Sequence, residues 1–372
     1  MIDKLRQEKK ANLMFITSSL YLGGVQRVTY LLADALSEEY DVTVVYCMET
    51  EKRQPYSERC RLIKLPEYSR DAGIIAKLHC ISRQVRELRN IKAELGTQVA
   101  VSLGNTANFL NIMSKNKERT MCAERSNPQQ SLGTVFLLMK VLFRRADRVV
   151  FQSEKIRSIF GRTVRSKSDI LKNPLDIPEP AMEHRNKIIV ALGRLTMQKN
   201  HALLIRSFAS FHRIHPEYCL HIYGTGELRE DLQAQIDALR LTESVILKGD
   251  QQDALRKIRD AEMFVLSSDW EGLPNSLLEC MSMGIACIST RCEGVCDVIR
   301  SGENGILVDI GNEAQLTEVM ILLAEDGDLR KKIEKQAMAD MKSFDRKAVI
   351  KDWENVIISQ LDAPNSHKED TR

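Results

Sequence analysis

Two glutamates, eight positions apart, frame the segment of this sequence that is best suited to bind a polar ligand. The segment Trp270–Glu279 reads Trp-Glu-Gly-Leu-Pro-Asn-Ser-Leu-Leu-Glu and follows a short apolar run that is typical of a buried parallel strand. A proline fits the first turn of a helix, where its missing N–H costs no hydrogen bond. The pattern therefore predicts a strand, a loop that carries Glu271, and a helix that starts near Pro274 or Asn275 and carries Glu279.

The chemistry of this segment points to a ligand with phosphate at its centre and hydroxyl groups at both ends. A helix start offers unpaired N–H groups and the positive end of the helix dipole, and both bind phosphate. A carboxylate accepts hydrogen bonds from two neighbouring hydroxyls, such as those of a ribose or a hexose. A nucleotide sugar fits this description. The simpler alternative is that one glutamate caps the helix while the other is solvated.

Two further turns carry residues that suit a diphosphate. Arg194 and Lys199 flank a predicted strand-to-helix turn, where one guanidinium and one ammonium can hold a diphosphate, although surface charge is the simpler interpretation. Gly224 and Gly226 follow the next predicted strand. No third glycine stands at Arg229, so we do not predict a nicotinamide site.

No metal or other cofactor is expected. The segment Asp326–Asp328 resembles the Asp-x-Asp of metal-dependent transferases, but a helix C-cap at Gly327 explains it better. Three cysteines cluster near one another without a histidine, so zinc is not favoured at Cys287, Cys292 and Cys296.

Short apolar runs alternate with amphipathic ones along the whole chain. Runs typical of strands occur at residues 12–17, 41–46, 98–102, 120–123, 147–151, 170–172, 187–192, 218–223, 244–248, 262–268 and 285–289. Runs typical of amphipathic helices occur at residues 28–36, 70–94, 313–325 and 346–361. This alternation predicts an α/β protein with parallel sheets and right-handed crossovers.

The length of 372 residues suits two domains of ordinary size. We expect a Rossmann-like N-terminal domain at residues 1–173, a proline-rich linker at 174–186 and a second Rossmann-like domain at 187–345. A C-terminal helix at 346–361 would pack back on the first domain, and a polar tail at 362–372 is expected to be disordered.

Composition and cysteine spacing indicate the cellular location. No run of eighteen apolar residues occurs, and the charged N-terminus lacks the apolar stretch of a secretion signal, so neither a spanning helix nor secretion is expected. Nine cysteines without paired spacing indicate reduced thiols and a cytoplasmic location.

The charge is distributed unevenly. Residues 1–180 hold 30 Lys and Arg against 20 Asp and Glu, whereas residues 181–372 hold 24 against 31. A basic half suggests a polyanionic surface as a partner, either a membrane or a nucleic acid. The amphipathic residues 70–94 and the apolar residues 132–145 could rest on an anionic membrane, although most such helices simply pack on a sheet. Nucleic acid is not favoured, because the basic residues lack interleaved aromatic residues or a known module.

Four motifs occur in the order that one family uses. Gly193–Asn200, Gly224–Glu227, Glu271–Glu279 and Gly302–Val308, together with the early pair Gly23–Gly24, resemble glycosyltransferase family 4, in particular its bacterial surface-polysaccharide members. These are retaining transferases with two Rossmann-like domains that face each other across a cleft, the GT-B type. The resemblance covers nearly the whole chain and is most specific in the second half.

The resemblance implies a role for each matching residue. Arg194 and Lys199 would neutralise the diphosphate and the charge of the leaving group, Glu279 would hold the ribose hydroxyls, and Glu271 would face the donor sugar and stabilise a cationic transition state. Glu271, Arg194 and Lys199 are thus the implied catalytic residues. The implied donor-binding set is Gly23, Gly24, Arg194, Lys199, Gly224, Gly226, Gly272, Leu273, Pro274, Asn275, Ser276 and Glu279. The cations and helix starts already supply positive charge, so no metal is implied.

The sequence departs from the family at one place. Many members carry a histidine near the reacting carbon, whereas the corresponding segment here, Ser102–Asn108, has none. Asn105 or Thr106 would take that role, or the role would lapse. The segment Glu124–Pro128 resembles a motif of polysaccharide-assembly members, which would place Glu124 and Arg125 on the acceptor side.

These inferences define one expected function and two alternatives. We expect a retaining hexosyltransferase that moves a hexose or N-acetylhexosamine from a UDP-sugar to a glycan acceptor, lipid-linked in surface-polysaccharide assembly. The enzyme would work in the cytoplasm, peripherally on the inner face of the cell membrane. A nucleotide-sugar epimerase of the same fold and a non-catalytic partner subunit are the alternatives.

Overall fold

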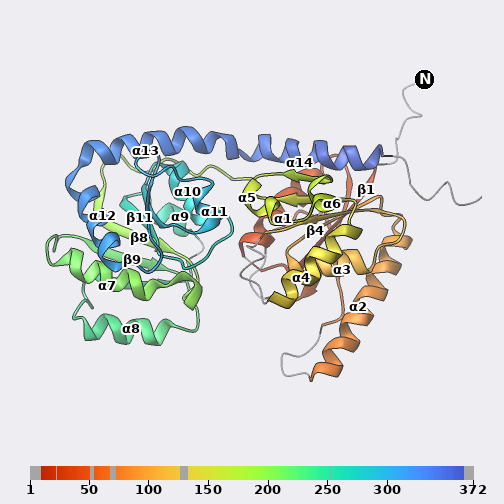
Figure 1. Ribbon diagram of the computed structural model, residues 1–372, viewed down its shortest axis with the longest axis horizontal. Helices are drawn as coiled ribbons and strands as arrows, with labels where there is room; N and C mark the ends of the chain where they lie inside the picture. Colours follow the sequence, from red (N-terminus) through yellow and green to blue (C-terminus); the bar gives the residue numbers. More distant parts are fainter. Residues whose placement is uncertain are drawn as a thin grey trace, which may run out of the picture. The chain divides into compact units, whose positions relative to one another are not determined.

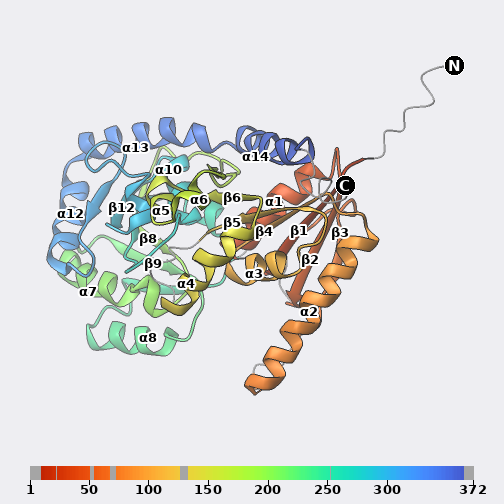
Figure 2. The ribbon, with the colours of Figure 1, turned by 45° about the vertical axis from the view of Figure 1, so that its right-hand side comes forward.

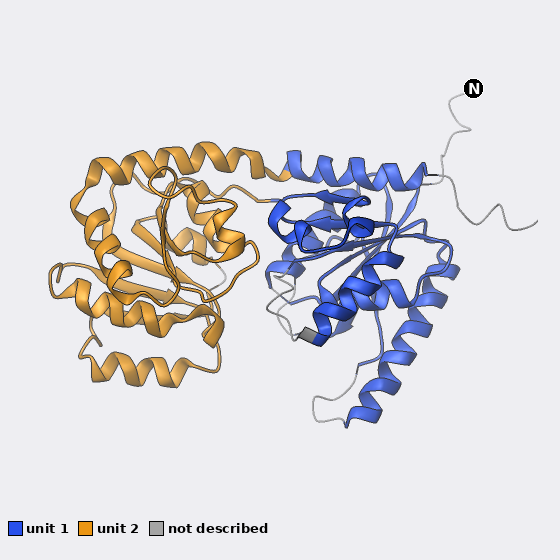
Figure 3. Ribbon diagram, viewed as in Figure 1, with its two compact units in different colours: residues 1–174, 347–372 blue, residues 175–346 orange. Residues whose placement is uncertain are grey.

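The computed structural model describes residues 10–21, 23–50, 54–67, 73–125, 133–251 and 253–363. The chain divides into two compact units (Figure 3). Unit 1 comprises residues 1–174 and 347–372, and unit 2 comprises residues 175–346.

Unit 1 contains a seven-stranded sheet whose strand pairs are all parallel (Figures 1 and 2). Its strands are β1 (Asn12–Ser19), β2 (Asp41–Met48), β3 (Arg61–Lys64), β4 (Val99–Leu103), β5 (Arg119–Ala123), β6 (Arg148–Phe151) and β7 (Ser168–Ile170), in the order β3-β2-β1-β4-β5-β6-β7. In the register of the central strands, Phe15 of β1 lies between Val44 of β2 and Val101 of β4. The central strands are buried almost throughout, as expected when helices cover both faces.

Alternate residues of β1 pack against different helices of unit 1. These helices are α1 (Gly24–Leu36), α2 (Ile74–Glu94), α3 (Asn105–Met113), α4 (Gly133–Leu142), η2 (Phe143–Arg145), α5 (Glu154–Ser158), α6 (Arg162–Arg165) and α14 (Arg346–Leu361). Leu13 and Phe15 pack with α1 and α14 on one face. Met14 and Ile16 pack with α2 and α3 on the other. This period of two is what the pleat of a doubly covered strand requires.

Unit 2 repeats the same plan with a six-stranded parallel sheet. Its strands are β8 (Asn186–Leu192), β9 (Cys219–Tyr223), β10 (Val245–Gly249), β11 (Ala261–Leu266), β12 (Ala286–Thr290) and β13 (Ile306–Val308), in the order β10-β9-β8-β11-β12-β13. Its helices are η3 (Met197–Lys199), α7 (His201–His212), α8 (Arg229–Ala238), α9 (Ala254–Lys257), α10 (Asn275–Met283), α11 (Glu293–Cys296), α12 (Glu313–Glu325), α13 (Gly327–Met341) and η4 (Lys342–Phe344). Ile189 packs with α7, α8 and α12, whereas Val190 packs with α10 and α13.

The strand orders confirm the predicted α/β class with two Rossmann-like units. In each sheet the order reverses at one point, between β1 and β4 in unit 1 and between β8 and β11 in unit 2. Open sheets of this kind bind ligands beyond the carboxyl ends of the strands at such a reversal. The loops that follow these four strands are therefore where functional residues are expected.

The structure also corrects one prediction made from the sequence. The prediction that Gly327 caps a helix C-terminus is wrong, because Gly327 begins α13 and Asp326 is its N-cap. The Asp326 carboxylate accepts a hydrogen bond from the Leu329 N–H at 2.8 Å, which is the geometry that favours aspartate before a helix. The edge strand β3 and helix α13 were not predicted. Among the described residues, no helix is long and apolar enough to cross a bilayer.

Candidate active site

The predicted strand, loop and helix around Glu271 are present in unit 2. All six residues of β11 are buried, and the loop that follows leads to Pro274, the N-cap of α10. The prediction that the helix starts near Pro274 or Asn275 is therefore confirmed. Residues 277–283 of α10 are all buried, and the helix ends at Gly284, which has φ +75°. The apolar body of α10 thus holds the loop and the helix start rigidly on the sheet.

Glu271 forms an ion pair with Lys199, from the loop after β8. The Lys199 Nζ lies 2.5 Å from Glu271 Oε1, and the two side chains are only 14% and 9% exposed. The hydroxyl of Ser268 donates to the same oxygen at 2.7 Å. The carboxylate and the ammonium that the sequence assigned to different parts of a ligand therefore neutralise each other in this structure.

Four further hydrogen bonds tie the loop after β8 to the loop after β11. The Asp269 N–H donates to the Gln198 carbonyl, and the Gln198 amide donates to the Trp270 carbonyl, both at 2.9 Å. The Ser267 hydroxyl donates to the Lys199 carbonyl at 2.9 Å. The amide of Asn200, which has a left-handed backbone, donates to Asp269 Oδ1 at 2.8 Å. The two loops consequently form one rigid structure across the strand reversal.

Glycines allow close backbone contacts around this structure. A Cβ at Gly224, whose φ is +142°, would lie 1.9 Å from the Gly193 carbonyl oxygen, and a Cβ at Gly226 would lie 2.2 Å from that of Leu195. The loop after β9 therefore packs directly on the loop that carries Arg194. A Cβ at Gly294 would lie only 1.4 Å from the Gly272 oxygen, so glycine is required there as well.

The remaining predicted residues of unit 2 lie on the same edge of the sheet. Arg194 is exposed, and within the described part of the chain its guanidinium makes no hydrogen bond or ion pair. Glu279 lies in α10 and is buried. The loop and helix start that carry the other residues are partly exposed, at Gly272, Leu273, Asn275 and Ser276.

The histidine nearest to this site is not a candidate acid. His201 is the first residue of α7 and is 4% exposed. Burial, together with the nearby Lys199 ammonium, lowers the pKa of His201 to about 4, so the ring is neutral at physiological pH. A structural role for His201 at the start of α7 is therefore the better interpretation.

The predicted residues of unit 1 also follow strands that are neighbours in the sheet. Gly23 and Gly24 follow β1, and Gly24 is the first residue of α1. Asn105 and Thr106 begin α3 after Gly104, whose φ is +87°. Glu124 and Arg125 follow β5, while residues 126–128 of the same motif lie outside the described residues. All three pairs therefore lie at the carboxyl edge of the sheet.

Arg125 packs inside unit 1. Its guanidinium lies 5.0 Å from the ring of Trp353 in α14 and donates to Asn173 Oδ1 at 2.7 Å. Gln152 donates to the same Asn173 oxygen at 3.1 Å. Burial lowers the pKa of Arg125 to about 9, and the Glu124 carboxylate opposes that shift. Arg125 therefore ties the end of β5 to α14, and its role toward an acceptor stays a prediction.

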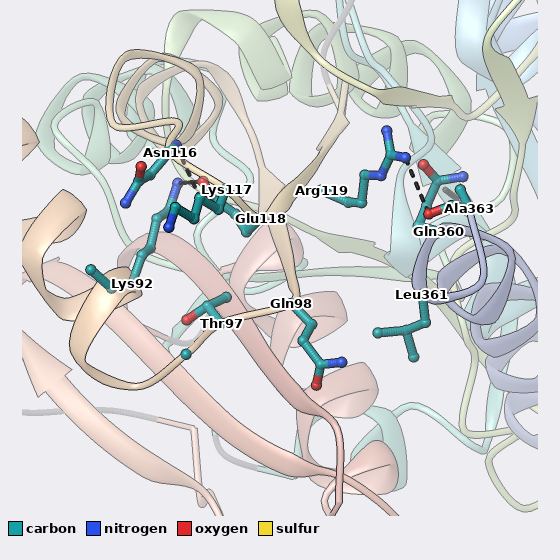
Figure 4. A pocket seen from close by; sticks show the side chains of 12 residues that line it. Lys92, Thr97, Gln98, Asn116, Lys117, Glu118, Arg119, Gln360, Leu361 and Ala363 are labelled. Atoms are coloured by element: carbon teal, nitrogen blue, oxygen red, sulfur yellow. Dashed lines mark hydrogen bonds and ion pairs between the residues drawn. The ribbon is translucent and has the colours of Figure 1, made fainter. Parts of the chain in front are cut away.

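A pocket of about 420 Å³ lies at the opposite edge of the unit 1 sheet (Figure 4). Lys92 and Glu118 lie together on one side, and Arg119 lies on the other, beside Gln360 and Ala363 of the C-terminal segment. The pocket is formed before β4 and β5, not beyond their carboxyl ends. It contains none of the predicted site residues, so it is separate from the candidate site.

The described residues contain no cluster of three His, Cys, Asp or Glu that could hold a metal. Each of the nine cysteines is a thiol and not half of a disulfide; Cys287 and Cys292 are buried, and Cys296 is exposed. Burial raises the pKa of the Cys292 thiol to about 11, which does not suit a thiolate ligand.

The residues that support Glu271 were not predicted from the sequence. Ser268, Thr290 and Cys292 are buried side chains whose hydrogen bonds converge on the loop after β11. The one available signal was the pair of serines that directly follows an apolar strand, since polar residues at strand ends commonly serve binding loops. Nothing in the sequence indicated that Thr290 and Cys292 lie against that loop.

Comparison of the sequence with known proteins finds sugar-transferring enzymes among its relatives. The family described as glycosyl transferases group 1 matches residues 173–340. A Campylobacter jejuni protein named N-acetylgalactosamine-N,N'-diacetylbacillosaminyl-diphospho-undecaprenol 4-alpha-N-acetylgalactosaminyltransferase is 28% identical over 356 residues, which are 90% of this chain and 96% of the relative. An uncharacterized glycosyltransferase of Methanocaldococcus jannaschii is 30% identical over 285 residues, which are 63% of this chain and 70% of the relative.

Solved structures share the fold over nearly the whole chain. HepE of Anabaena, in complex with UDP and glucose, superimposes with a TM-score of 0.81 at 15% identity and covers 93% of this chain and 99% of its own. The lipopolysaccharide outer core galactosyltransferase WaaB in its apo form gives a TM-score of 0.73 at 19% identity, with 94% and 99% covered. At these identities the likeness shows the fold alone.

Proposed function

Because the chain belongs to the glycosyl transferases of group 1 and has the GT-B fold, we propose that it transfers a hexose or N-acetylhexosamine from a UDP-sugar, with retention, to a lipid-linked glycan. The observation that carries this proposal is the ion pair of Lys199 with Glu271 across the strand reversal of unit 2. It brings a cation for phosphate and a carboxylate for hydroxyls within one ligand's reach.

Each group of the site has a distinct task in this reaction. Arg194 is exposed, so its guanidinium is free to bind the diphosphate bidentately, and Lys199 would neutralise the charge that develops on the leaving group. Glu271 would hold the donor sugar and stabilise the cationic transition state. Glu279 would bind the ribose, and the N–H groups around Asn275 would complete the part of the phosphate site that unit 2 supplies.

The lipid-linked acceptor is supported by the names of relatives. The Campylobacter jejuni relative is named for an acceptor linked to diphospho-undecaprenol. A second relative from the same organism, 23% identical over 352 residues, is likewise named for a PP-undecaprenol-linked acceptor. Both matches span at least 90% of this chain, so the unit that would bind the acceptor is included.

Thermal unfolding with a panel of UDP- and GDP-sugars tests the donor. One UDP-sugar at a hundredfold excess over its Kd should stabilise the protein by about 2.7 kcal/mol, whereas GDP-sugars should have little effect. The Arg194→Ala variant should lose most of that stabilisation, and Arg213→Ala, an exposed arginine of α7's C-cap, is the matched control. Stabilisation by no UDP-sugar would contradict the proposal. Incubation of the donor without acceptor should yield no epimer, which separates transfer from epimerisation.

Two helices of unit 1, α2 and α4, carry exposed apolar side chains that would suit a membrane surface. In α4, Leu137 is 64% exposed, and Leu138 and Val141 are exposed beside it. The amino-terminal part of α2 extends beyond the rest of unit 1 in both views (Figures 1 and 2), and Ile75 in it is 85% exposed. Arg144 and Arg145 lie in η2, which follows α4 directly. Apolar side chains next to arginines are the pattern of helices that lie on anionic lipid.

We expect the protein to float with phosphatidylglycerol vesicles and not with vesicles of neutral lipid. The Leu137→Asp/Val141→Asp variant should reduce the bound fraction about tenfold, because charges replace apolar side chains at the lipid contact. The matched control is Ile310→Asp/Leu322→Asp, which changes two exposed apolar residues of unit 2 and should leave flotation unchanged. Flotation that does not depend on anionic lipid would count against this role.

A further inference from the structure

Ser268 occupies an unusual position behind the candidate catalytic carboxylate. It lies two residues after the end of β11, and its side chain is fully buried. Its hydroxyl donates to Glu271 Oε1 at 2.7 Å, and the Lys199 ammonium donates to the same oxygen at 2.5 Å. Within the part of the chain that the structure describes, the other oxygen, Oε2, receives no hydrogen bond. One oxygen is therefore held inward while the other is left for a ligand.

Ser268 is itself held from behind by the end of β12. Its carbonyl accepts hydrogen bonds from the Thr290 hydroxyl and from the Cys292 thiol, the latter at 3.0 Å. Both donors are buried. The Cys292 thiol keeps its proton at neutral pH, because burial raises its pKa, and it can therefore act as the donor. The end of β12 and the residues that follow it therefore fix the backbone from which the Ser268 hydroxyl projects.

When a donor binds, Lys199 has a second anion to interact with besides the Glu271 carboxylate. A diphosphate competes for its ammonium, and a lysine side chain is flexible enough to turn toward a new anion. If Lys199 moves, Ser268 is the remaining partner of Glu271 Oε1 among the described residues. The carboxylate would then keep its orientation only through the serine hydroxyl.

We propose that Ser268 is a positioning residue that presents the Oε2 oxygen of Glu271 to the donor sugar while Lys199 binds the diphosphate. This inference rests on the proposed function of the site. Ser268 does not touch substrate, and it acts through Glu271. Thr290 and Cys292 act indirectly, because they donate hydrogen bonds to the backbone carbonyl of Ser268.

Steady-state kinetics of Ser268→Ala, with the UDP-sugar that the panel selects, tests the proposal. We expect kcat to fall about tenfold to a hundredfold while KM for the donor changes less than about threefold, since a misplaced reacting group lowers turnover more than binding. Ser268→Thr keeps the hydroxyl and should recover most of the lost kcat. Cys292→Ala keeps the Ser268 hydroxyl but removes one donor to the Ser268 carbonyl. It should therefore lower kcat less than Ser268→Ala does.

Ser207→Ala is the matched control. Ser207 is also fully buried in unit 2, but its hydroxyl donates to the backbone carbonyl of Glu313 at 3.2 Å, away from the site. This variant should keep the wild-type kcat. Wild-type kcat in Ser268→Ala, or equal losses in Ser268→Ala and Ser268→Thr with both variants folded, would overturn the positioning role alone. A panel in which no UDP-sugar binds would instead overturn the proposed function.

Discussion

The Glu271→Gln variant is expected to bind UDP as the wild type does and to lose sugar transfer by about a hundredfold or more. Glutamine keeps the shape of the side chain and removes its charge. In the proposed reaction the carboxylate stabilises a positive charge that exists only in the transition state, so its loss lowers kcat and leaves nucleotide binding intact. UDP titration by calorimetry and initial rates of transfer measure the two effects separately.

A second glutamate of the same segment provides the contrast for this experiment. Glu279 lies in α10 and would bind the ribose, so Glu279→Gln should weaken UDP binding and affect kcat less. Loss of transfer without loss of UDP binding in Glu271→Gln, and the reverse in Glu279→Gln, would distinguish the sugar side of the site from its nucleotide side. Transfer at the wild-type rate in Glu271→Gln would rule out the role given to this carboxylate, and equal loss of UDP binding in both variants would show that the two sides are not separate.

Lys92→Met should reduce the stability of unit 1 by about 3–5 kcal/mol, the range found when one partner of a buried ion pair is removed. The Lys92 Nζ lies 2.7 Å from Glu118 Oε1, and both side chains are 1% exposed. The ammonium also donates to the side-chain and backbone oxygens of Asn111, at 2.8 and 3.0 Å. Burial lowers the pKa of Lys92, and Glu118 opposes that shift. Methionine would leave the Glu118 carboxylate buried without its counter-charge.

Differential scanning calorimetry and a double variant test this explanation. Glu118→Gln in the Lys92→Met background removes the unpaired charge and should recover part of the lost stability. The matched control is Arg83→Met, which breaks a pair with Glu87 in the same helix, where the side chains are 55% and 36% exposed. Exposed pairs contribute less than about 1 kcal/mol, so this control should change little. A loss below about 1 kcal/mol in Lys92→Met would contradict the explanation.

Local sequence patterns predicted the elements of the site well. The apolar run before Trp270, the Gly-Leu-Pro turn and the leucine pair predict a strand, a loop and a helix start, and β11 and α10 have this arrangement. Each of these signals depends on residues within one or two turns of chain, which is the range over which propensity and periodicity act. Helices α12 and α14 also have the predicted bounds, because their apolar residues recur at helical spacing.

Short segments whose local sequence is compatible with two structures were predicted less well. An Asp-Gly-Asp run can end one helix or start the next, and here Asp326 does both, as the C-cap of α12 and the N-cap of α13. The hydrogen bond that the Leu329 N–H donates to Asp326 places Gly327 in the second helix. The strand β3 has four residues at the edge of its sheet, with no fully buried position, so it lacks the apolar run of the central strands.

The α/β class, the candidate loops at the carboxyl ends of the strands and the types of side chain in those loops follow from local residue patterns. How those side chains pair depends on the three-dimensional fold of the unit. Lys199 and Glu271 are far apart in the chain, and they meet because β8 and β11 are neighbours across the strand reversal. The same sheet order brings Thr290 and Cys292 behind Ser268. Such contacts depend on the order of strands in space, which local residue patterns do not encode.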